Sequence, residues 1–133
     1  MDAILLKQSF DLIVPQKEAF AETFYTALFE RYPQTQSLFV SADMQQQQRA
    51  LIFALVFVVS GVVRGDDIAP TVQQLGQRHG TYGVKAEHYT MVGEVLLATL
   101  QQFLKEQWTP QVEETWIGAY TTVSTLMQQP TND

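Results

Sequence analysis

Histidine is the side chain that titrates near neutrality by default, and this sequence contains two of them. His79 lies at the end of an amphipathic segment and shares one face with Val72 and Leu75, whereas His88 follows Glu87 at the start of the next segment. An imidazole can transfer a proton or bind a metal or a haem iron. A single histidine on an apolar face is more often an ordinary core or boundary residue. Spacing alone therefore leaves both roles open for His79 and favours an ordinary surface role for His88.

A second set of residues could donate hydrogen bonds at a site. Tyr25 directly follows Phe24, and Gln47 and Leu51 are four residues apart, which places them on one face of a helix. Taken singly, Tyr25 is equally typical of a core aromatic, and Gln47 of a solvated residue in a glutamine run. A Ser60–His79–Asp triad can be drawn, but such a triad can be drawn in most sequences. The motifs HExxH, GxxxxGK[ST] and GxSxG are absent.

Composition excludes several classes of function. The chain has no cysteine, so disulfides, iron–sulfur clusters and thiol nucleophiles are excluded. Eight basic residues against fourteen acidic ones give a net charge of −6, and the basic residues are spread evenly along the chain. They form no basic stripe, so we expect no nucleic-acid partner.

The organisation indicated is one domain over residues 1–133, with a frayed tail over 128–133. Hydrophobic residues make up 46% of the chain, enough for a proper core. The longest apolar run, 51–63, is thirteen residues long and falls short of the roughly 20 needed to span a bilayer. The first residues do not resemble a signal peptide, so we expect a cytoplasmic protein without membrane insertion.

Apolar residues recur at helical spacing along the whole chain, and no alternating strand pattern is found. Ser41 or Asp43 can cap the central helix, and Gly80 and Gly83 are expected to end the helix that carries His79. The class predicted is all-α with about seven helices. The main helical segments are 4–14, 17–32, 44–63, 70–80, 85–107 and 110–127.

Taken together, these positions resemble a globin over nearly the whole chain, from about Leu5 to Met127. The resemblance is closest to bacterial single-domain globins and to the haem domain of flavohaemoglobins. It also includes the spacings, because 32 residues separate Gln47 from His79 and ten separate His79 from Tyr89. The segments that carry it are Phe24-Tyr25 with Leu28-Phe29, Tyr32-Pro33 with Phe39, Gln47–Leu51, Leu75–His79, Tyr82–Leu97, Trp116 and Tyr120.

The resemblance implies a haem b cofactor with His79 as its proximal iron ligand. Tyr25 and Gln47 are similar to the distal pair that donates hydrogen bonds to a diatomic ligand. Tyr89 is similar to the residue that buttresses the proximal histidine, and a carboxylate that joins it in flavohaemoglobins matches Asp133. The other positions implied to contact the haem or line its distal side are Phe24, Phe39, Leu51, Val84 and Val92.

Three functions follow as expectations. The first is reversible binding of oxygen, and of NO and CO, at a five-coordinate or weakly six-coordinate iron, for storage, delivery or sensing. The second is an enzyme, a nitric oxide dioxygenase that depends on an external reductase, because 133 residues leave no room for flavin and nicotinamide domains. The third is a haem-free helical module for protein contacts, which the polar residues at the expected pocket disfavour.

Overall fold

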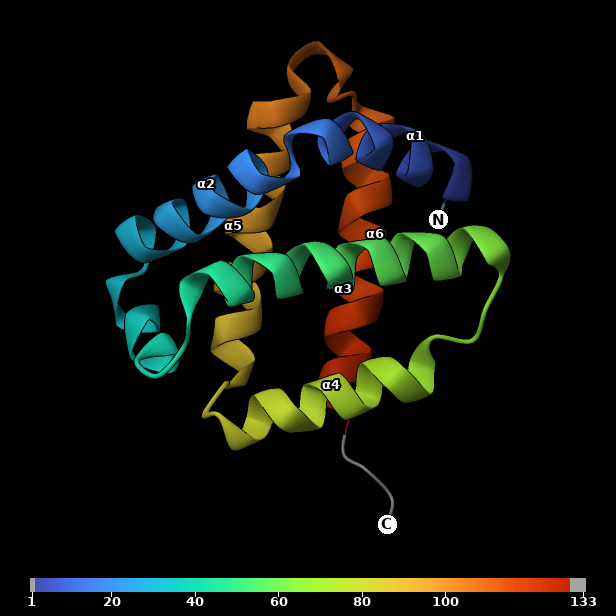
Figure 1. Cartoon of the computed structure of the whole chain (residues 1–133). Coiled ribbons are helices and arrows are strands. Elements are labelled where there is room, and N and C mark those ends of the chain that lie inside the picture. The colour runs from blue at the N-terminus through green and yellow to red at the C-terminus, as the bar shows by residue number, and fades with distance from the viewer. Residues whose placement is uncertain (1, 130–133) are drawn as a thin grey trace.

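A computed structural model describes residues 2–129, and in these residues it contains helices and no strand (Figure 1). The all-α prediction is confirmed, with six α-helices and three short 3-10 helices in place of about seven helices. The elements are α1 (Ala3–Ile13), η1 (Val14–Gln16), α2 (Lys17–Arg31), η2 (Pro33–Phe39), α3 (Met44–Arg64), α4 (Ala69–Thr81), α5 (Ala86–Leu104), η3 (Lys105–Gln107) and α6 (Pro110–Gln128).

Short polar side chains cap the starts of α1, α3 and α6, where they accept hydrogen bonds from backbone N–H groups that no helical carbonyl can reach. Asp43, rather than Ser41, caps α3 and accepts from the N–H groups of Gln45 and Gln46 at 3.0 and 3.4 Å. Thr109 caps α6 through the N–H of Val112 at 3.2 Å. The end of α3 is set by Gly65, whose φ of 72° is the left-handed conformation that favours glycine.

The observed helix ends differ from the expected ones at three places. The fifth helix ends at Leu104 rather than at 107, because Lys105 takes a φ of 52° and a 3-10 turn follows. Helix α4 continues through Gly80 to Thr81, and it is Gly83, with a φ of 90°, that turns the chain toward α5. Residue 128, expected in the tail, is the last residue of α6, and residues 130–133 lie outside the described part.

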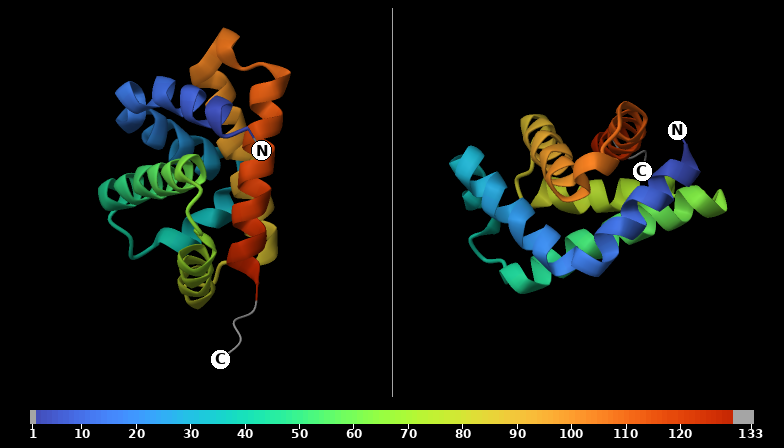
Figure 2. Two further views of the ribbon diagram at one scale, coloured as in Figure 1. Left: turned by 90° about the vertical axis from the view of Figure 1, so that its right-hand side faces the viewer. Right: turned by 90° about the horizontal axis from the view of Figure 1, so that it is seen from above.

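The helices pack in two groups that differ in their partners. Helix α2 packs on α5, and α3 runs across both α1 and α2, whereas α4 packs on α6. Figure 1 shows α3 and α4 one above the other, with α5 passing behind α3 and α6 passing behind both, and the side view in Figure 2 agrees for α6. Aromatic pairs pack between helices in the core. The ring centroids of Phe20 on α2 and Phe103 on α5 are 5.4 Å apart, and those of Phe10 on α1 and Trp116 on α6 are 6.3 Å apart.

Helix α3 is more apolar than the thirteen-residue run indicated. It is the one helix in residues 2–129 that is long and apolar enough to cross a membrane, by length and composition alone. Its most apolar window has a mean hydropathy of 1.5, yet only 11% of that window is buried. Val59 is buried, Leu51 and Leu55 are half-buried, and Phe53 is 73% exposed. Contacts with α1 and α2 therefore cover only part of the apolar surface of this helix.

A buried hydrogen bond between α1 and α6 provides a stability prediction. The indole N–H of Trp116 donates to the Ser9 hydroxyl at 2.9 Å, and both residues are buried. Because Ser9→Ala leaves this N–H without a partner, we expect the free energy of unfolding to fall by about 1–3 kcal/mol in urea titrations. Thr122→Ala is the control, since its exposed hydroxyl bonds only to Gly118 of the same helix. Equal losses in the two variants would contradict the prediction.

Candidate functional site

Tyr25 and Gln47 are brought into direct contact although 22 residues separate them. The Tyr25 hydroxyl accepts from the Gln47 side-chain amide at 3.2 Å and donates to the Gln47 carbonyl at 3.5 Å. Within the glutamine run it is therefore Gln47, the half-buried third member, that faces the tyrosine. Burial raises the pKa of Tyr25, and the hydrogen bond from Gln47 opposes this more weakly. The phenol is therefore held neutral and keeps its proton as a donor.

Aromatic rings from α2 and η2 surround the Tyr25 phenol. Its ring centroid lies 4.9 Å from that of Phe24 and 5.6 Å from that of Phe39, both edge-on. Phe29, which the sequence analysis did not assign to the site, packs against Phe39 at 5.5 Å. Phe29 follows Tyr25 by four residues on the same helix, and this spacing could have predicted that the two side chains lie on one face. Half-buried Leu51 lies one turn after Gln47, so the four expected distal residues lie on α2 and the start of α3, and Phe39 lies on η2.

His79 is half-buried near the end of α4, and its ring orientation is set by the backbone of its own helix. Its Nδ1 lies 2.7 Å from the carbonyl oxygen of Leu75, one turn earlier. Because a carbonyl only accepts, this geometry assigns the ring proton to Nδ1. The lone pair of Nε2 is then free, and a neutral imidazole with one free nitrogen is the form that binds a metal.

The chain beyond His79 makes a tight turn that leads into α5. The N–H groups of Tyr82 and Val84 both donate to the His79 carbonyl, at 3.0 and 3.1 Å. Val84, Tyr89 and Val92 are half-buried at this end of the molecule. No hydrogen bond joins Tyr89 to His79 within residues 2–129, so the expected buttress stays a prediction. The carboxylate expected to join it, at residue 133, lies outside the described part of the chain.

His88 has a structural role that the sequence analysis did not anticipate. The Nδ1 atom of the His88 ring accepts a hydrogen bond from the backbone N–H of Lys85 at 2.8 Å. The backbone N–H of His88 in turn donates to the backbone carbonyl of Lys85 at 2.9 Å. These reciprocal bonds form a cap at the start of α5. The imidazole nitrogen accepts the hydrogen bond that a carboxylate or amide oxygen accepts in the usual capping box, and His88 is half-buried.

Tyr120 joins α6 to α5 and gives the molecule a sensitivity to alkali. Its hydroxyl donates to the Tyr89 carbonyl at 2.5 Å, and its ring lies against Gly93, where a Cβ would come within 2.6 Å of Cε2. Burial, with a smaller contribution from Tyr89, raises the pKa of Tyr120 well above its ordinary value of 10.0. The folded state therefore keeps the phenolic proton at a pH where the unfolded chain loses it.

We expect this tyrosine to contribute stability that is complete below about pH 10 and is lost as the pH rises further. Urea unfolding measured between pH 8 and pH 11.5 checks the expectation. Tyr120→Phe is the comparison, because it cannot ionise and should lose less stability over the same interval. If the two chains lose stability in parallel, other groups cause the alkaline loss.

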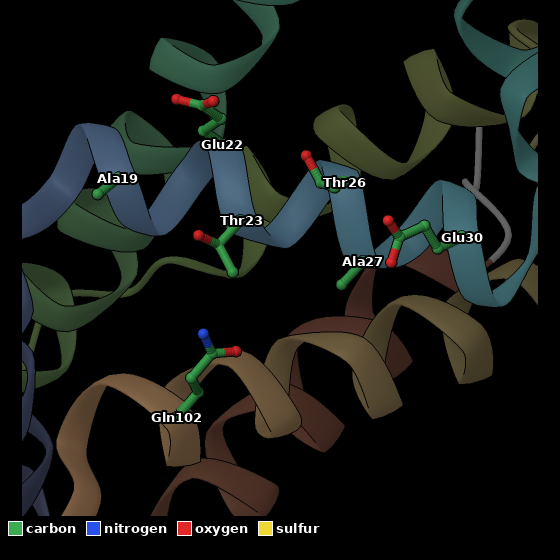
Figure 3. Close-up of a pocket in the computed structure, with 7 residues that line it drawn as sticks. All are labelled: Ala19, Glu22, Thr23, Thr26, Ala27, Glu30 and Gln102. Atoms are coloured by element: carbon green, nitrogen blue, oxygen red, sulfur yellow. The ribbon is translucent and has the colours of Figure 1, made fainter.

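A separate hollow lies on another face of α2 (Figure 3). It has a volume of about 510 Å³, and Thr23 of α2 and Gln102 of α5 point toward each other across it. None of the residues expected at the site lines it. Its lining is mostly polar and exposed, so we assign it no ligand. The residues that line it are Ala19, Glu22, Thr23, Thr26, Ala27, Glu30 and Gln102.

The helical fold is that of a globin. The family model described as Globin matches residues 22–127. The chain belongs to the globin family, as the sequence resemblance indicated.

Its curated relatives include flavohemoproteins. The chain is 30% identical over 125 residues to the flavohemoprotein of Bordetella parapertussis, covering 92% of this chain and 31% of that protein. It is 27% identical over 118 residues to the flavohemoprotein of Bacillus subtilis, covering 87% of this chain and 30% of that protein. The chain thus spans less than a third of the length of these relatives.

A solved structure supports the same fold. It is an engineered carbene transferase from Rhodothermus marinus, a protein assigned provisionally as a nitric oxide dioxygenase. The two structures superpose with a TM-score of 0.82 at 26% sequence identity, covering 94% of this chain and 87% of the other. The whole described arrangement of helices is therefore that of a globin.

Globin membership implies a haem, and the residues present fit one. Residues 2–129 contain no cluster of three or more His, Cys, Asp or Glu side chains able to hold a bare metal ion. A haem needs only one protein ligand on one side of its iron, and His79 offers a free Nε2. The incompletely covered apolar surface of α3 is of the kind that a large apolar cofactor contacts. The His79 donor atom and the apolar surface of α3 are thus both compatible with a bound haem.

Proposed function

We propose that this globin is a haem b protein that binds oxygen reversibly, with NO and CO as further ligands, for storage, delivery or sensing. The observation that carries the proposal is the Tyr25–Gln47 pair, a neutral phenol and an amide in contact at 3.2 Å. The two groups satisfy each other's hydrogen bonds among aromatic side chains, and both carry protons that a bound ligand could accept.

Each expected residue has a role in this proposal. A haem held by one imidazole would supply an iron able to bind a diatomic ligand. His79 would hold the haem through Nε2, while Phe39, Val84 and Val92 would contact its apolar surface. Tyr25 and Gln47 would donate hydrogen bonds to the ligand, and Phe24 and Leu51 would exclude water and restrict access. Tyr89 would support the proximal side.

The two donors should make oxygen release slow. A hydrogen bond to a charged acceptor contributes about 1.5–3 kcal/mol, which is roughly ten- to a hundredfold in affinity. Oxygen would accept hydrogen bonds from both donors more strongly than CO would. The proposal therefore predicts an oxygen affinity raised selectively over that for CO.

Nitric oxide dioxygenation is the second candidate, and the similarity to flavohemoproteins and to the Rhodothermus protein favours it. The same pair of donors would serve this reaction. In this proposal an external reductase supplies the electrons.

Absorption spectra test the first proposal. The purified protein, supplied with hemin and reduced, should show a Soret band that shifts with CO and an oxygenated form that persists for minutes. Absence of any Soret band would refute the haem proposal and favour a haem-free interaction module. Sustained NO consumption with a reductase and a nicotinamide donor would favour the enzyme, whereas a single rapid oxidation is common to globins and would not.

The remaining expectations stay proposals. We propose a single domain over residues 1–133 that works in the cytoplasm, without a nucleic-acid partner and without membrane insertion. Cell fractionation tests the compartment, because recovery of the chain with membranes would contradict it and would direct attention to α3.

A further inference from the structure

Among the glycines of this chain, Gly76 lies nearest to the backbone of another helix. A Cβ placed on Gly76 would lie 2.0 Å from the carbonyl oxygen of Met127 and 2.4 Å from its Cα. Both atoms belong to the backbone of α6, so no side chain can rotate away to make room. The backbone of α4 therefore rests directly on the last turn of α6, which passes behind α4 in Figure 1.

Neighbouring contacts show that Gly76 belongs to a larger packing interface between α4 and α6, called the seat below. Gly76 is buried, and Val72, one turn earlier on α4, is 2% exposed. On the same side, the amide of Gln73 donates to the side-chain oxygen of Gln129 at 2.7 Å. Helix α4 packs on α6 more extensively than on any other helix. The position of α4 in the molecule thus depends on how closely it sits on α6.

His79 is linked to this seat through a short piece of backbone. The ring is oriented by the carbonyl of Leu75, the residue directly before Gly76. His79 itself follows Gly76 by three residues on the same rigid helix. A side chain at position 76 would force α4 away from α6 by on the order of 1 Å, because packed helices have no spare room. The Leu75 carbonyl and the His79 ring would move together with the helix.

We propose that Gly76 is a positioning residue for the haem ligand, because it lets α4 lie on the α6 backbone and so sets where Nε2 of His79 stands. This inference rests on the proposed role of His79. Glycine is required here for its lack of a side chain rather than for its conformation, since its φ is not positive. The role differs from a general contribution to stability, because the predicted effect is on the histidine–iron bond.

The test compares Gly76→Ala with Gly80→Ala. Gly80 lies one residue after His79 in the same helix, and a Cβ there would meet nothing within 4 Å. Both substitutions add one methyl group and the same gain in helix propensity. The readouts are the histidine–iron stretching band of the reduced protein in resonance Raman spectra and the rate of haem transfer to an acceptor apoglobin.

We expect Gly76→Ala to shift or weaken the stretching band and to speed haem transfer by about ten- to a hundredfold, the range seen when groups that orient a metal ligand are lost. Gly80→Ala should keep the parent band and a transfer rate within about twofold of the parent. A Gly76→Ala protein that matches Gly80→Ala in both readouts would overturn the inference. So would a Gly76→Ala chain that stays unfolded with haem present, because Gly76 would then act in folding rather than in positioning.

Val72→Ala separates positioning from stability. This change removes a buried side chain of the same helix but leaves the backbone contact of Gly76 with α6 in place. It should lower the free energy of unfolding and leave the band unmoved; an equal shift in Val72→Ala would overturn the specific role of Gly76. The parent protein tests the underlying assumption separately. If it shows no band that depends on His79, the proposed function fails, whereas a parent band that survives in Gly76→Ala refutes only this inference.

Discussion

A chain carrying His79→Gly is expected to lose tightly held haem and to regain the parent spectrum when imidazole is added. The substitution removes the free Nε2 that the Leu75 carbonyl orients, and it leaves a space that a free imidazole can enter. Haem bound only to the folded state stabilises it by about 2.7 kcal/mol at a hundred times its Kd. The parent should therefore melt at a higher temperature when haem is added, and the variant should show this rise only with imidazole.

His88→Ala is the matched control, since it removes the other histidine. It should keep the haem spectrum and lose about 0.5–2 kcal/mol of stability, because the cap at the start of α5 is lost. If His79→Gly binds haem as the parent does without imidazole, the assignment of the ligand is wrong. If His88→Ala instead loses the spectrum, the ligand is on α5.

Tyr25→Phe is expected to speed oxygen release by about ten- to a hundredfold, the value of one hydrogen bond to a charged acceptor. The change keeps the ring that packs between Phe24 and Phe39 and removes only the hydroxyl. Release of CO should change less, because CO accepts hydrogen bonds weakly. Stopped-flow ligand replacement measures both rates. Tyr82→Phe, at a tyrosine that is 70% exposed, should leave both unchanged.

The same experiment shows whether the distal pair acts as a unit. The Gln47 amide donates to the Tyr25 hydroxyl, so removing either side chain changes the orientation of the other. Groups in contact are commonly coupled by 0.5–3 kcal/mol. The effects of Tyr25→Phe and Gln47→Leu on oxygen release should therefore not add in the double variant. Equal acceleration of oxygen and CO release in Tyr25→Phe would mean that the tyrosine controls access rather than bonding.

Much of the fold could be predicted from the sequence because helix formation depends on residues that are close together in the chain. The apolar spacing in 17–32 and 44–63 depends only on residues three and four apart, and both segments are helices in the structure, with ends shifted by one residue. Capping is local as well, so Asp43 could be named as a candidate. The end of α5 could not, because the left-handed Lys105 occupies a conformation that lysine rarely prefers.

The residues expected at the site came from a resemblance in order and spacing rather than from their individual chemistry. His79 and Gln47 each have an ordinary reading when taken singly. Nothing local brings Gln47 to Tyr25, since they are 22 residues apart and on different helices. Their contact depends on how α3 crosses α2, which the core as a whole decides.

By itself the sequence determined the helical class, the helix positions and membership of the globin family, because each follows from short-range periodicity or from the order of residue types. Only the tertiary structure decided that Gln47 directly contacts Tyr25, that the Leu75 carbonyl orients His79, and that Gly76 lies against Met127. These are contacts set by backbone position, and the last joins helices about fifty residues apart in the chain. Such contacts leave no periodic trace in the sequence, so the packing of the helices must be known before they can be seen.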